Sequence, residues 1–333
     1  MKYFSFPQLK NYLLANWGHK SYECKNEPTR ICLYVTDRCT LSCKWCLRQS
    51  TQDKFSNKRH DMSVDQARKI LQHFPNAARL SLAGFGEPLM VDDLFKITAE
   101  FKKRPMRVSI ITNGTLLLER IDDILHAEFH GIEVSLNSLD ATDYKLTCGG
   151  NENTFNNIFK GIQILVEKRK STKPYLSLSF VLTRDLFNRT PEIIKFAEEA
   201  KVDRLTLHNL IPHDDYNDYT GVLTTDDEEV VAKFSEWKRT KKKVQVNWPR
   251  LVQKGLEKSA GICKPSWIWL GIDMEGNTAG CSRAMGTCRD YGNLFQEGKK
   301  VWNNEFREKL RKSFLNGNKF LFDCCKTCVE VQP

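Results

Sequence analysis

The sequence predicts an α/β fold built on parallel strands, with a smaller and differently built region at its C-terminal end. From residue 30 to about residue 210, short apolar runs rich in β-branched residues alternate with amphipathic helical stretches. The strand-like runs are separated by helices, which implies parallel pairing through crossover connections. After about residue 212 this alternation ends, and a cysteine-rich segment follows.

Six strands are expected, and helices separate each strand from the next. The strands are expected at 30–36, 79–84, 107–114, 131–138, 175–183 and 204–210. The helices between them are expected at 63–74, 92–103, 116–127, 154–170 and 190–200. Ser63 and Gln66 stand at the start of the first of these helices with the spacing of a capping box.

The region after the sixth strand follows another pattern. A polar segment after residue 212 is expected to be a loop, and a charged helix follows it. Alternating residues on both sides of Glu275-Gly276-Asn277 predict a hairpin within 267–281, and an amphipathic helix is expected at 301–317. The expected domain division is therefore an N-terminal extension at 1–29, a core at 30–215, a connecting segment at 216–262 and a small domain at 263–333.

Composition sets limits on compartment and partners. Of the 333 residues, 41% are hydrophobic and 28% charged, as in ordinary globular proteins, and no apolar run approaches the ~20 residues of a membrane span. The N-terminal stretch lacks an apolar signal-peptide core, so we expect a cytoplasmic protein without a membrane partner. The net charge of +10 suits a polyanion, but the basic residues are not interleaved with aromatic ones, which makes nucleic acid the least favoured partner.

Three of the twelve cysteines, Cys39, Cys43 and Cys46, lie within eight residues at the spacing C-x3-C-x2-C. Thiolates suit iron–sulfur clusters or zinc, but a structural zinc site needs four protein ligands. A 4Fe–4S cluster takes one cysteine on each iron, so three cysteines leave one iron open to a substrate or cofactor. A zinc site completed by a distant residue is the alternative.

This loop resembles the signature loop of the radical S-adenosylmethionine (radical SAM) superfamily. Trp45, before the last cysteine, is the usual aromatic residue there. The run 84–88, Gly-Phe-Gly-Glu-Pro, is similar to the motif whose backbone holds the methionyl amino group, and its glycines permit close backbone approach. The runs 112–114 and 135–137 resemble positions that contact the ribose or the methionyl group. Each motif is expected at the C-terminal end of a strand, where parallel β/α barrels form ligand sites.

The resemblance implies an enzyme with a partial (β/α)6 TIM-like barrel. Its open iron would chelate S-adenosylmethionine, and one electron, from a donor such as flavodoxin or ferredoxin, would break the C5′–S bond. The resulting 5′-deoxyadenosyl radical would take a hydrogen atom from the substrate. The residues implied to line the S-adenosylmethionine site are Trp45, Gly86, Glu87, Asn113, Ser135 and Asn137.

The C-terminal cysteines resemble those of the auxiliary cluster domains called SPASM and, in their shorter form, twitch. Cys263 is followed after twelve residues by Gly276, and Gly276 after four by Cys281. The middle cysteine run of a full SPASM domain is absent, which indicates the twitch form with one auxiliary 4Fe–4S cluster. The implied ligands are Cys263, Cys281, Cys325 and Cys328. Cys324 is an alternative to Cys325, and a zinc site built from the same four cysteines is the alternative to the cluster.

Three classes of substrate are expected, in the following order of preference. We favour oxidation or rearrangement of a small polar metabolite such as a sugar-like alcohol or an aminocyclitol. Modification of a ribosomally made peptide, by crosslinking or epimerisation, comes second, because only about thirty residues precede the first strand, too few for a leader-binding domain. An RNA-modifying cluster protein ranks last. The related molybdopterin-pathway nucleotide cyclase carries a Gly-Gly tail, whereas this sequence ends CVEVQP, so we set that assignment aside.

Several cysteines lie outside these groups. Cys24, Cys32 and Cys148 are expected to be small buried residues, and Cys288 has no assigned role. Cys148 lies just past the fourth strand, near the expected active face, where a thiol could return a hydrogen atom to a substrate radical. Packing under the turn at Gly149 and Gly150 is the favoured interpretation. No other catalytic residue is assigned.

Overall fold

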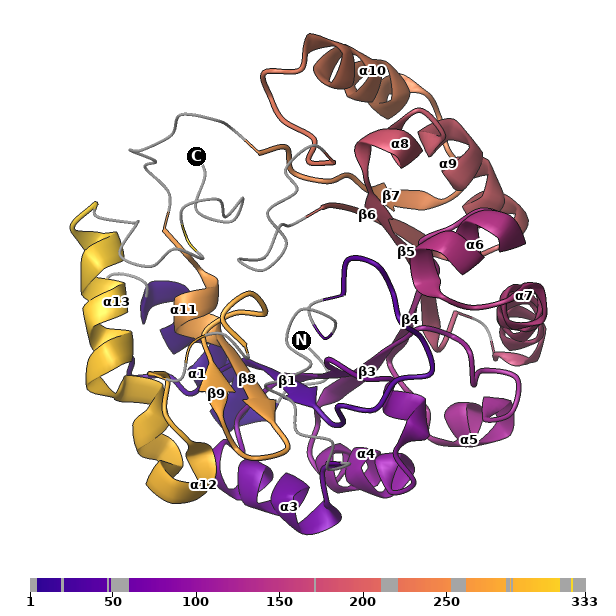
Figure 1. The fold of residues 1–333 in the computed structure, drawn as a ribbon. Coiled ribbons are helices and arrows are strands. Elements are labelled where there is room, and N and C mark those ends of the chain that lie inside the picture. The colour runs from indigo at the N-terminus through magenta and orange to yellow at the C-terminus, as the bar shows by residue number, and fades with distance from the viewer. Residues whose placement is uncertain are drawn as a thin grey trace. The chain divides into compact units, whose positions relative to one another are not determined.

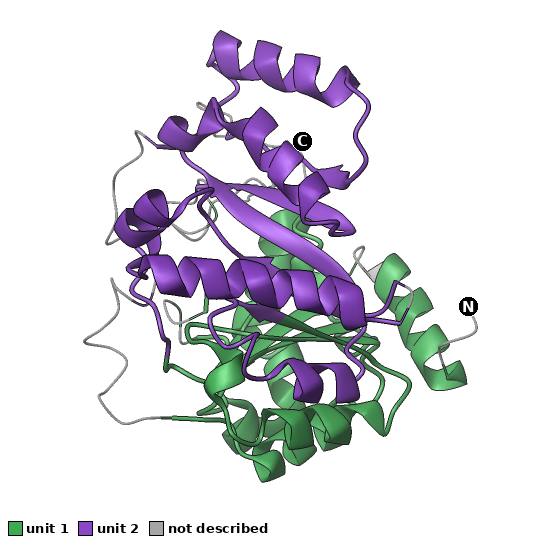
Figure 2. Cartoon of the chain, turned by 90° about the vertical axis from the view of Figure 1, so that its right-hand side faces the viewer, with its two compact units in different colours: residues 1–38, 55–110, 256–333 green, residues 39–54, 111–255 purple. Residues whose placement is uncertain are grey.

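The chain is described here from a computed structural model. The structure describes residues 5–18, 21–46, 48, 60–170, 172–210, 221–252, 262–285, 288, 290–317 and 325. The chain forms two compact units, coloured separately in Figure 2. Unit 1 comprises residues 1–38, 55–110 and 256–333, and unit 2 comprises residues 39–54 and 111–255.

Unit 1 contains a sheet with the strand order β3-β2-β1-β8-β9. Its strands are β1 (Arg30–Tyr34), β2 (Arg79–Ala83), β3 (Arg107–Thr112), β8 (Trp269–Asp273) and β9 (Thr278–Ala279), and the last two residues of β3 belong to unit 2. β1 pairs in parallel with β2 and with β8, while β8 and β9 form the antiparallel hairpin expected from the sequence.

The helices of unit 1 begin where the sequence offers caps. They are α1 (Phe6–Gly18), α3 (Val64–His73), η1 (Pro88–Met90), α4 (Leu94–Lys102), α11 (Pro265–Ile268), α12 (Leu294–Glu297), η2 (Gly298–Asn303) and α13 (Glu305–Leu315). The predicted capping box is present at α3: Ser63 Oγ accepts from the Gln66 amide at 3.2 Å, and Gln66 Oε1 accepts from the Ser63 amide at 2.7 Å. These bonds satisfy N–H groups that have no partner within the helix.

Unit 2 contains four parallel strands in the order β7-β6-β5-β4. The strands are β4 (Gly131–Ser135), β5 (Tyr175–Leu182), β6 (Arg204–Asn209) and β7 (Gln245–Asn247). The helices are α5 (Ile121–His126), α6 (Ala141–Cys148), α7 (Glu152–Lys168), α8 (Arg184–Phe187), α9 (Thr190–Glu199) and α10 (Glu228–Arg239). In Figure 1 the helices α6 to α9 lie along one side of these strands.

The two faces of the unit 2 sheet differ in chemistry. Val134 and Leu178 are buried, and Val134 packs close to Ile158 of α7 around Gly114, where a Cβ would lie 2.9 Å from either side chain. Because successive strand residues point to opposite faces, the neighbouring polar residues face away from the helices. Helices therefore cover an apolar face and leave a polar one, as in other parallel β/α proteins.

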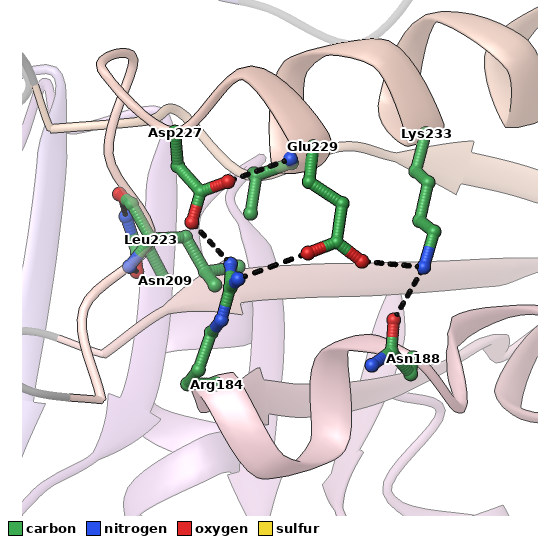
Figure 3. Close-up of polar contacts among 8 residues, drawn as sticks. Arg184, Asn188, Asn209, Leu223, Asp227, Glu229 and Lys233 are labelled. Carbon is green, nitrogen blue, oxygen red and sulfur yellow. Dashed lines mark hydrogen bonds and ion pairs between the residues drawn. The ribbon is translucent and has the colours of Figure 1, made fainter.

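Residues 223–229 are fastened to the end of β6 and to α8 by the polar contacts in Figure 3. Asn209 donates to the carbonyl O of Leu223 at 2.7 Å and accepts from its amide at 3.0 Å. Arg184 pairs with Asp227 and with Glu229, the latter at 3.1 Å. Both carboxylates stand at the start of α10, where negative charge is favourable. These contacts fix the first turn of α10 within unit 2.

Sequence and structure agree on the main elements. All six expected strands and the five helices between them are present, and the α/β fold class is confirmed. The strand β7 and the helices α6 and α8 were not expected. The expected domain boundaries at residues 30, 216 and 263 remain a prediction. Among the described residues, no helix has the length and apolarity needed to cross a membrane.

Candidate active site

The loop that carries Cys39, Cys43 and Cys46 is held by the C-terminus of α6, within unit 2. The Ser42 amide donates to the carbonyl O of Cys148 at 3.2 Å, and the Lys44 amide donates to that of Thr147 at 2.9 Å. The last carbonyl groups of a helix lack partners inside it, so the loop supplies the donors that α6 needs. The positions of these three cysteines therefore depend on α6.

Two glycines after α6 allow this close approach. Gly149 adopts a φ of +76° as the C-cap, and a Cβ there would lie 2.3 Å from Ser42 Oγ. A Cβ on Gly150 would lie 2.4 Å from the ring of Tyr144. A side chain at Gly149 would push the cysteine loop away from α6, and one at Gly150 would collide with Tyr144 of α6.

Asn113, after β3, reaches the first cysteine of the loop. Its Nδ2 lies 3.5 Å from Cys39 Sγ and donates to Thr40 Oγ1 at 3.0 Å. Its Oδ1 accepts from the amide and the hydroxyl of Thr115, at 3.0 Å and 2.8 Å, which fixes the side chain. The structure therefore brings together a predicted cofactor-binding residue and a predicted iron ligand.

The thiol of Cys148 lies against Cys43 and was not foreseen there. Cys148 is 2% exposed and its Sγ is 3.8 Å from the carbonyl O of Leu136, just past β4. The contact with Cys148, together with burial, raises the pKa of Cys43. This burial beneath the cysteine loop supports the packing interpretation of Cys148.

The loop carries the type of donor that the group implied by the resemblance needs. Cys39, Cys43 and Cys46 are half-buried, and none of the described cysteines forms a disulfide. Their soft thiol donors, grouped on one short loop, suit an iron–sulfur cluster better than a closed zinc site. Across the described residues, no three or more Cys, His, Asp or Glu side chains are gathered tightly enough to hold a metal ion. Ligation by these cysteines therefore stays a proposal.

The turn after β2, in unit 1, meets the chain just before Cys39. The Gly86 amide donates to the carbonyl O of Thr36 at 3.1 Å, and the Glu87 amide donates to that of Arg38 at 2.7 Å. A Cβ on Gly86 would lie 2.2 Å from the Arg38 oxygen. Gly86 therefore makes room for the protein's own backbone, one residue before the first cysteine.

Two acidic side chains, those of Glu87 and Asp61, stabilise the place where the turn after β2 meets residues 36–38. The Glu87 carboxylate is 1% exposed and accepts from the Leu89 amide at 2.9 Å, so it caps η1. Asp61 accepts from Thr36 Oγ1 at 2.6 Å and pairs with Arg38, and this hydrogen bond raises the pKa of the Arg38 guanidinium. Residues 36–38 are thus fixed from two sides before the cysteine loop begins.

The remaining predicted contacts with S-adenosylmethionine have clear placements in unit 2. Ser135, at the end of β4, lies with its Oγ 3.1 Å from Ser179 Oγ. Asn137 has a φ of +58°, and its Oδ1 accepts from the Val181 amide at 2.9 Å. Trp45 is half-buried, with Lys44 Nζ 5.4 Å from its ring centroid. The Asn137 side chain therefore links the C-terminal ends of β4 and β5.

A polar row lies on the face of the unit 2 sheet away from the helices, and of its members only Ser135 was predicted from the sequence. Ser135, Ser179 and Thr206 occupy matching positions on β4, β5 and β6, and the exposed His208 lies opposite Val181. The signal was available, because polar and apolar residues alternate along these strands. The row gives this face hydroxyl and imidazole groups near the C-terminal strand ends.

The C-terminal cysteines are described only in part. Cys263 and Cys281 are half-buried, and their carbonyl groups accept from the amides of Ser266 at 3.0 Å and Ala284 at 3.2 Å. Cys325 is also half-buried, whereas the predicted ligand Cys328 and the alternative Cys324 lie outside the described residues. Cys288 has its Sγ 3.8 Å from an oxygen of Asp290.

The comparisons with known proteins agree with the resemblance of the cysteine loop to the radical SAM superfamily. Residues 33–181 match the family model described as the radical SAM superfamily. A tungsten-containing aldehyde ferredoxin oxidoreductase cofactor-modifying protein of Pyrococcus furiosus is 30% identical over 191 residues, 54% of this chain and 51% of that protein. A probable GTP 3′,8-cyclase of Methanococcus maripaludis is 28% identical over 68% of this chain and 73% of its own. The match therefore spans only about half the length of the Pyrococcus relative.

Solved structures share the fold. Streptococcus suis SuiB superposes with a TM-score of 0.67 at 18% identity, over 86% of this chain and 68% of its own, and it has also been solved with S-adenosylmethionine and with the precursor peptide SuiA. Residues 33–181 therefore resemble the radical SAM superfamily, which implies a 4Fe–4S cluster and S-adenosylmethionine.

Proposed function

We propose that this enzyme cleaves S-adenosylmethionine reductively and abstracts a hydrogen atom from a small polar substrate, giving oxidation or rearrangement. The observation that carries the substrate class is the polar row of Ser135, Ser179, Thr206 and His208 on the face of the unit 2 sheet away from the helices, where Ser179 is buried and His208 is exposed. Hydroxyl and imidazole groups suit the hydroxyl and amino groups of a sugar-like or aminocyclitol-like molecule. This composition would not suit an apolar substrate, whose burial would leave these groups without partners.

The row and the cysteine loop are linked within unit 2. Ser135 precedes Leu136, whose carbonyl O faces Cys148, and Cys148 contacts Cys43. Cys39, Cys43 and Cys46 would hold the cluster, and Asn113 would orient groups beside Cys39. When bound, the cluster supplies the electron that cleaves S-adenosylmethionine, and the protein orients the substrate and keeps water out.

A C-terminal auxiliary 4Fe–4S cluster of the twitch type forms part of this proposal. Its ligands would be Cys263, Cys281, Cys325 and Cys328, with Cys324 as the alternative to Cys325. The proposal also includes an electron donor such as flavodoxin or ferredoxin. It further includes a cytoplasmic location. The half-buried state of Cys263 and Cys281, both in unit 1, is compatible with the first two ligands.

A ribosomally made peptide is the second candidate substrate. It is favoured by the shared fold with SuiB, which has been solved with its precursor peptide. Because the identity is 19%, this likeness concerns the fold, and the polar row keeps the small substrate first.

The deciding experiment is a substrate screen that follows 5′-deoxyadenosine by mass spectrometry. Anaerobically purified and reconstituted enzyme, S-adenosylmethionine and dithionite are incubated with a panel of aminocyclitols and sugars and, separately, with short peptides. We expect a polar small molecule to raise 5′-deoxyadenosine at least tenfold over the substrate-free rate, with no such rise for Cys39→Ala. A rise with peptides alone would replace the first candidate by the second.

A further inference from the structure

Arg204, the first residue of β6, is a cation without an anionic partner in the part of unit 2 that the structure describes. Its guanidinium takes part in no ion pair and no hydrogen bond among these residues, and its Nε is shielded from water. The neighbouring carboxylate is already engaged, because Asp203 pairs with Arg169 and accepts from the Leu176 amide at 2.7 Å. A shielded N–H group without an acceptor costs free energy, so the position of this arginine needs an explanation.

An aromatic ring holds the Arg204 guanidinium in place. Its Cζ lies 4.8 Å from the ring centroid of Tyr175 on β5. The Tyr175 hydroxyl donates to Gln245 Oε1 at 2.9 Å, so the ring itself is fixed between β5 and β7. A ring face attracts a cation but does not use its N–H groups, and these groups therefore stay available to a ligand.

Arg204 faces the same side of the sheet as the polar row of the proposed function. Arg204 is in register with Ser177, and Ser177 is in register with Glu133, so the three side chains share one face. Each of them lies two residues before a member of the polar row on its own strand. These three residues, the charged row, therefore run beside the polar row at a distance of about 7 Å along the strands.

The charged row has one negative and one positive end. Glu133 and Arg204 are half-buried, and the Glu133 carboxylate has no hydrogen bond or ion pair among the described residues. Ser177, which is 5% exposed, stands between them, so two strand spacings, about 10 Å, separate the two backbones. Because the two charges do not meet each other, each keeps its capacity to hold one end of a small molecule.

We propose that Arg204 and Glu133 select the charge of the substrate. Arg204 binds an acid group, a carboxylate or a phosphate monoester, and Glu133 accepts from an amino or hydroxyl group at the other end. This inference rests on the proposed function, whose polar row it extends. A guanidinium donates two parallel hydrogen bonds to either kind of acid group, and such charge-assisted bonds are about twice as strong as neutral ones. The substrate is therefore a polar molecule with an acid group at one end, not a neutral sugar.

The test uses probes that share a pyranose ring and differ in charge. They are glucose, glucose 6-phosphate, glucuronate and glucosamine 6-phosphate. Binding of each probe to the full reconstituted chain is measured by isothermal titration calorimetry, under anaerobic conditions and in a buffer without phosphate. The variants are Arg204→Gln, Arg204→Lys and Glu133→Gln. Arg239→Gln, which removes an exposed arginine at the end of α10, is the matched control.

We expect at least one acid-bearing probe to bind about tenfold more tightly than glucose, and Arg204→Gln to abolish that advantage. Arg204→Lys should retain part of it, and Arg239→Gln should match the parent. Glucuronate and glucose 6-phosphate distinguish a carboxylate from a phosphate as the preferred group. Glu133→Gln should weaken the binding of glucosamine 6-phosphate more than that of glucose 6-phosphate, because only the amino group carries a charge that the carboxylate attracts. Thermal unfolding without probe should change little in Arg204→Gln, because its guanidinium has no acidic partner to lose.

The outcomes separate this inference from the function on which it rests. Equal binding of glucose and the acid-bearing probes, or an advantage of the acid that survives in Arg204→Gln, would overturn the inference. The proposed function would then still stand if neutral sugars raise 5′-deoxyadenosine. Formation of 5′-deoxyadenosine with peptides alone would remove the small substrate, and this inference with it. A loss of thermal stability in both Arg204→Gln and Glu133→Gln, without any change in binding, would show that the two charges serve the fold and would also overturn the inference.

Discussion

Gly86 shows how a single residue can have a role other than the one its motif suggests. The resemblance of residues 84–88 to a cofactor-binding motif predicted that Gly86 leaves room for the cofactor. The structure shows a second cause, since a Cβ there would lie 2.2 Å from the Arg38 carbonyl O. The same glycine therefore governs the backbone that leads into the cysteine loop.

Gly86→Ala should therefore impair cluster assembly as well as cofactor binding. The added methyl group must displace the backbone at Arg38, so reconstituted protein should hold less iron, by about half of the core cluster, and bind S-adenosylmethionine more weakly. Iron analysis and equilibrium binding measure the two effects. Gly221→Ala is the control, because its new Cβ would meet only side-chain atoms, the end of Leu210 at 3.0 Å and Thr183 Cβ at 3.9 Å. Full iron with weakened cofactor binding would restore the original interpretation.

Cys148→Ala tests the buried thiol beneath the cysteine loop. Because Cys148 is 2% exposed and packs against Cys43, we expect turnover to continue and thermal stability to fall by about 1 kcal/mol. Reactions in deuterated water should give product without deuterium from this thiol. Cys32→Ala, which removes another buried thiol, on β1, serves as the control. Formation of 5′-deoxyadenosine without product in the Cys148 variant would instead identify Cys148 as a hydrogen-atom donor.

At the scale of elements, α6 was missed by the sequence although it supports the cysteine loop. Its cap is Asp140, whose Oδ1 accepts from the Asp143 amide at 2.8 Å and whose other oxygen pairs with Arg189 at 3.3 Å. The helix has only eight residues and no clear apolar stripe, so periodicity could not reveal it. Its contacts with residues 42 and 44 depend on distant parts of the sequence.

Asp140→Ala should destabilise α6 by about 1 kcal/mol, the usual cost of a lost cap, and should increase the loss of iron from the loop. Asp140→Asn keeps the cap and should lie close to the parent at pH 7. The Asp143 amide, and then Arg189, lower the pKa of Asp140, so its stabilisation is present above the ordinary carboxyl pKa and is lost as the pH falls through the lowered value. In thermal melts between pH 3 and pH 7, the advantage of the parent over Asp140→Ala should shrink towards the acid end, while Asp140→Asn keeps its own advantage over Asp140→Ala.

Asn209 should be essential for the position of the segment that leads to α10. It is 8% exposed, and its Nδ2 donates to the carbonyl O of Leu223 and to that of Arg250. Asn209→Asp removes both donors and should cost about 1–3 kcal/mol of unfolding free energy. Urea melts measure it, and Asn247→Asp on the exposed edge of β7 is the control. Equal stability of the two variants would show that this fastening contributes nothing.

The sequence predicted the regular elements and the motifs, because both are local. Alternating apolar runs revealed β1 to β6, and Ser63 with Gln66 revealed the start of α3. The contacts of Cys148 with Cys43, and the burial of Arg307, depend on residues far apart in the chain and had no local signal. The strand β7 has only three residues, Gln245–Asn247, and pairs with β6 through its backbone. Its three side chains therefore form no recognisable strand pattern in the sequence.

For the whole molecule, the central expectation is a count of metal atoms. If both cysteine groups ligate clusters, reconstituted protein should hold about eight iron atoms, four in each cluster. Replacing Cys39, Cys43 and Cys46 together by Ala should remove about four of them and abolish cleavage of S-adenosylmethionine. Iron analysis of wild type and variant, prepared side by side under anaerobic conditions, gives the answer. About four iron atoms in wild type and none in the variant would leave only the core cluster.

The bonds between the cysteine loop and α6 also have an electronic consequence. The amides of Ser42 and Lys44 donate to carbonyl groups of α6, and the Cys46 amide donates to that of Cys43 at 3.1 Å. Amides engaged in this way cannot donate to sulfur, and fewer donors to sulfur lower the affinity of a cluster for its extra electron. An iron–sulfur group on this loop would therefore release that electron readily, which makes it a strong reductant. The α6 terminus would thus influence both the position of such a cluster and its reducing strength.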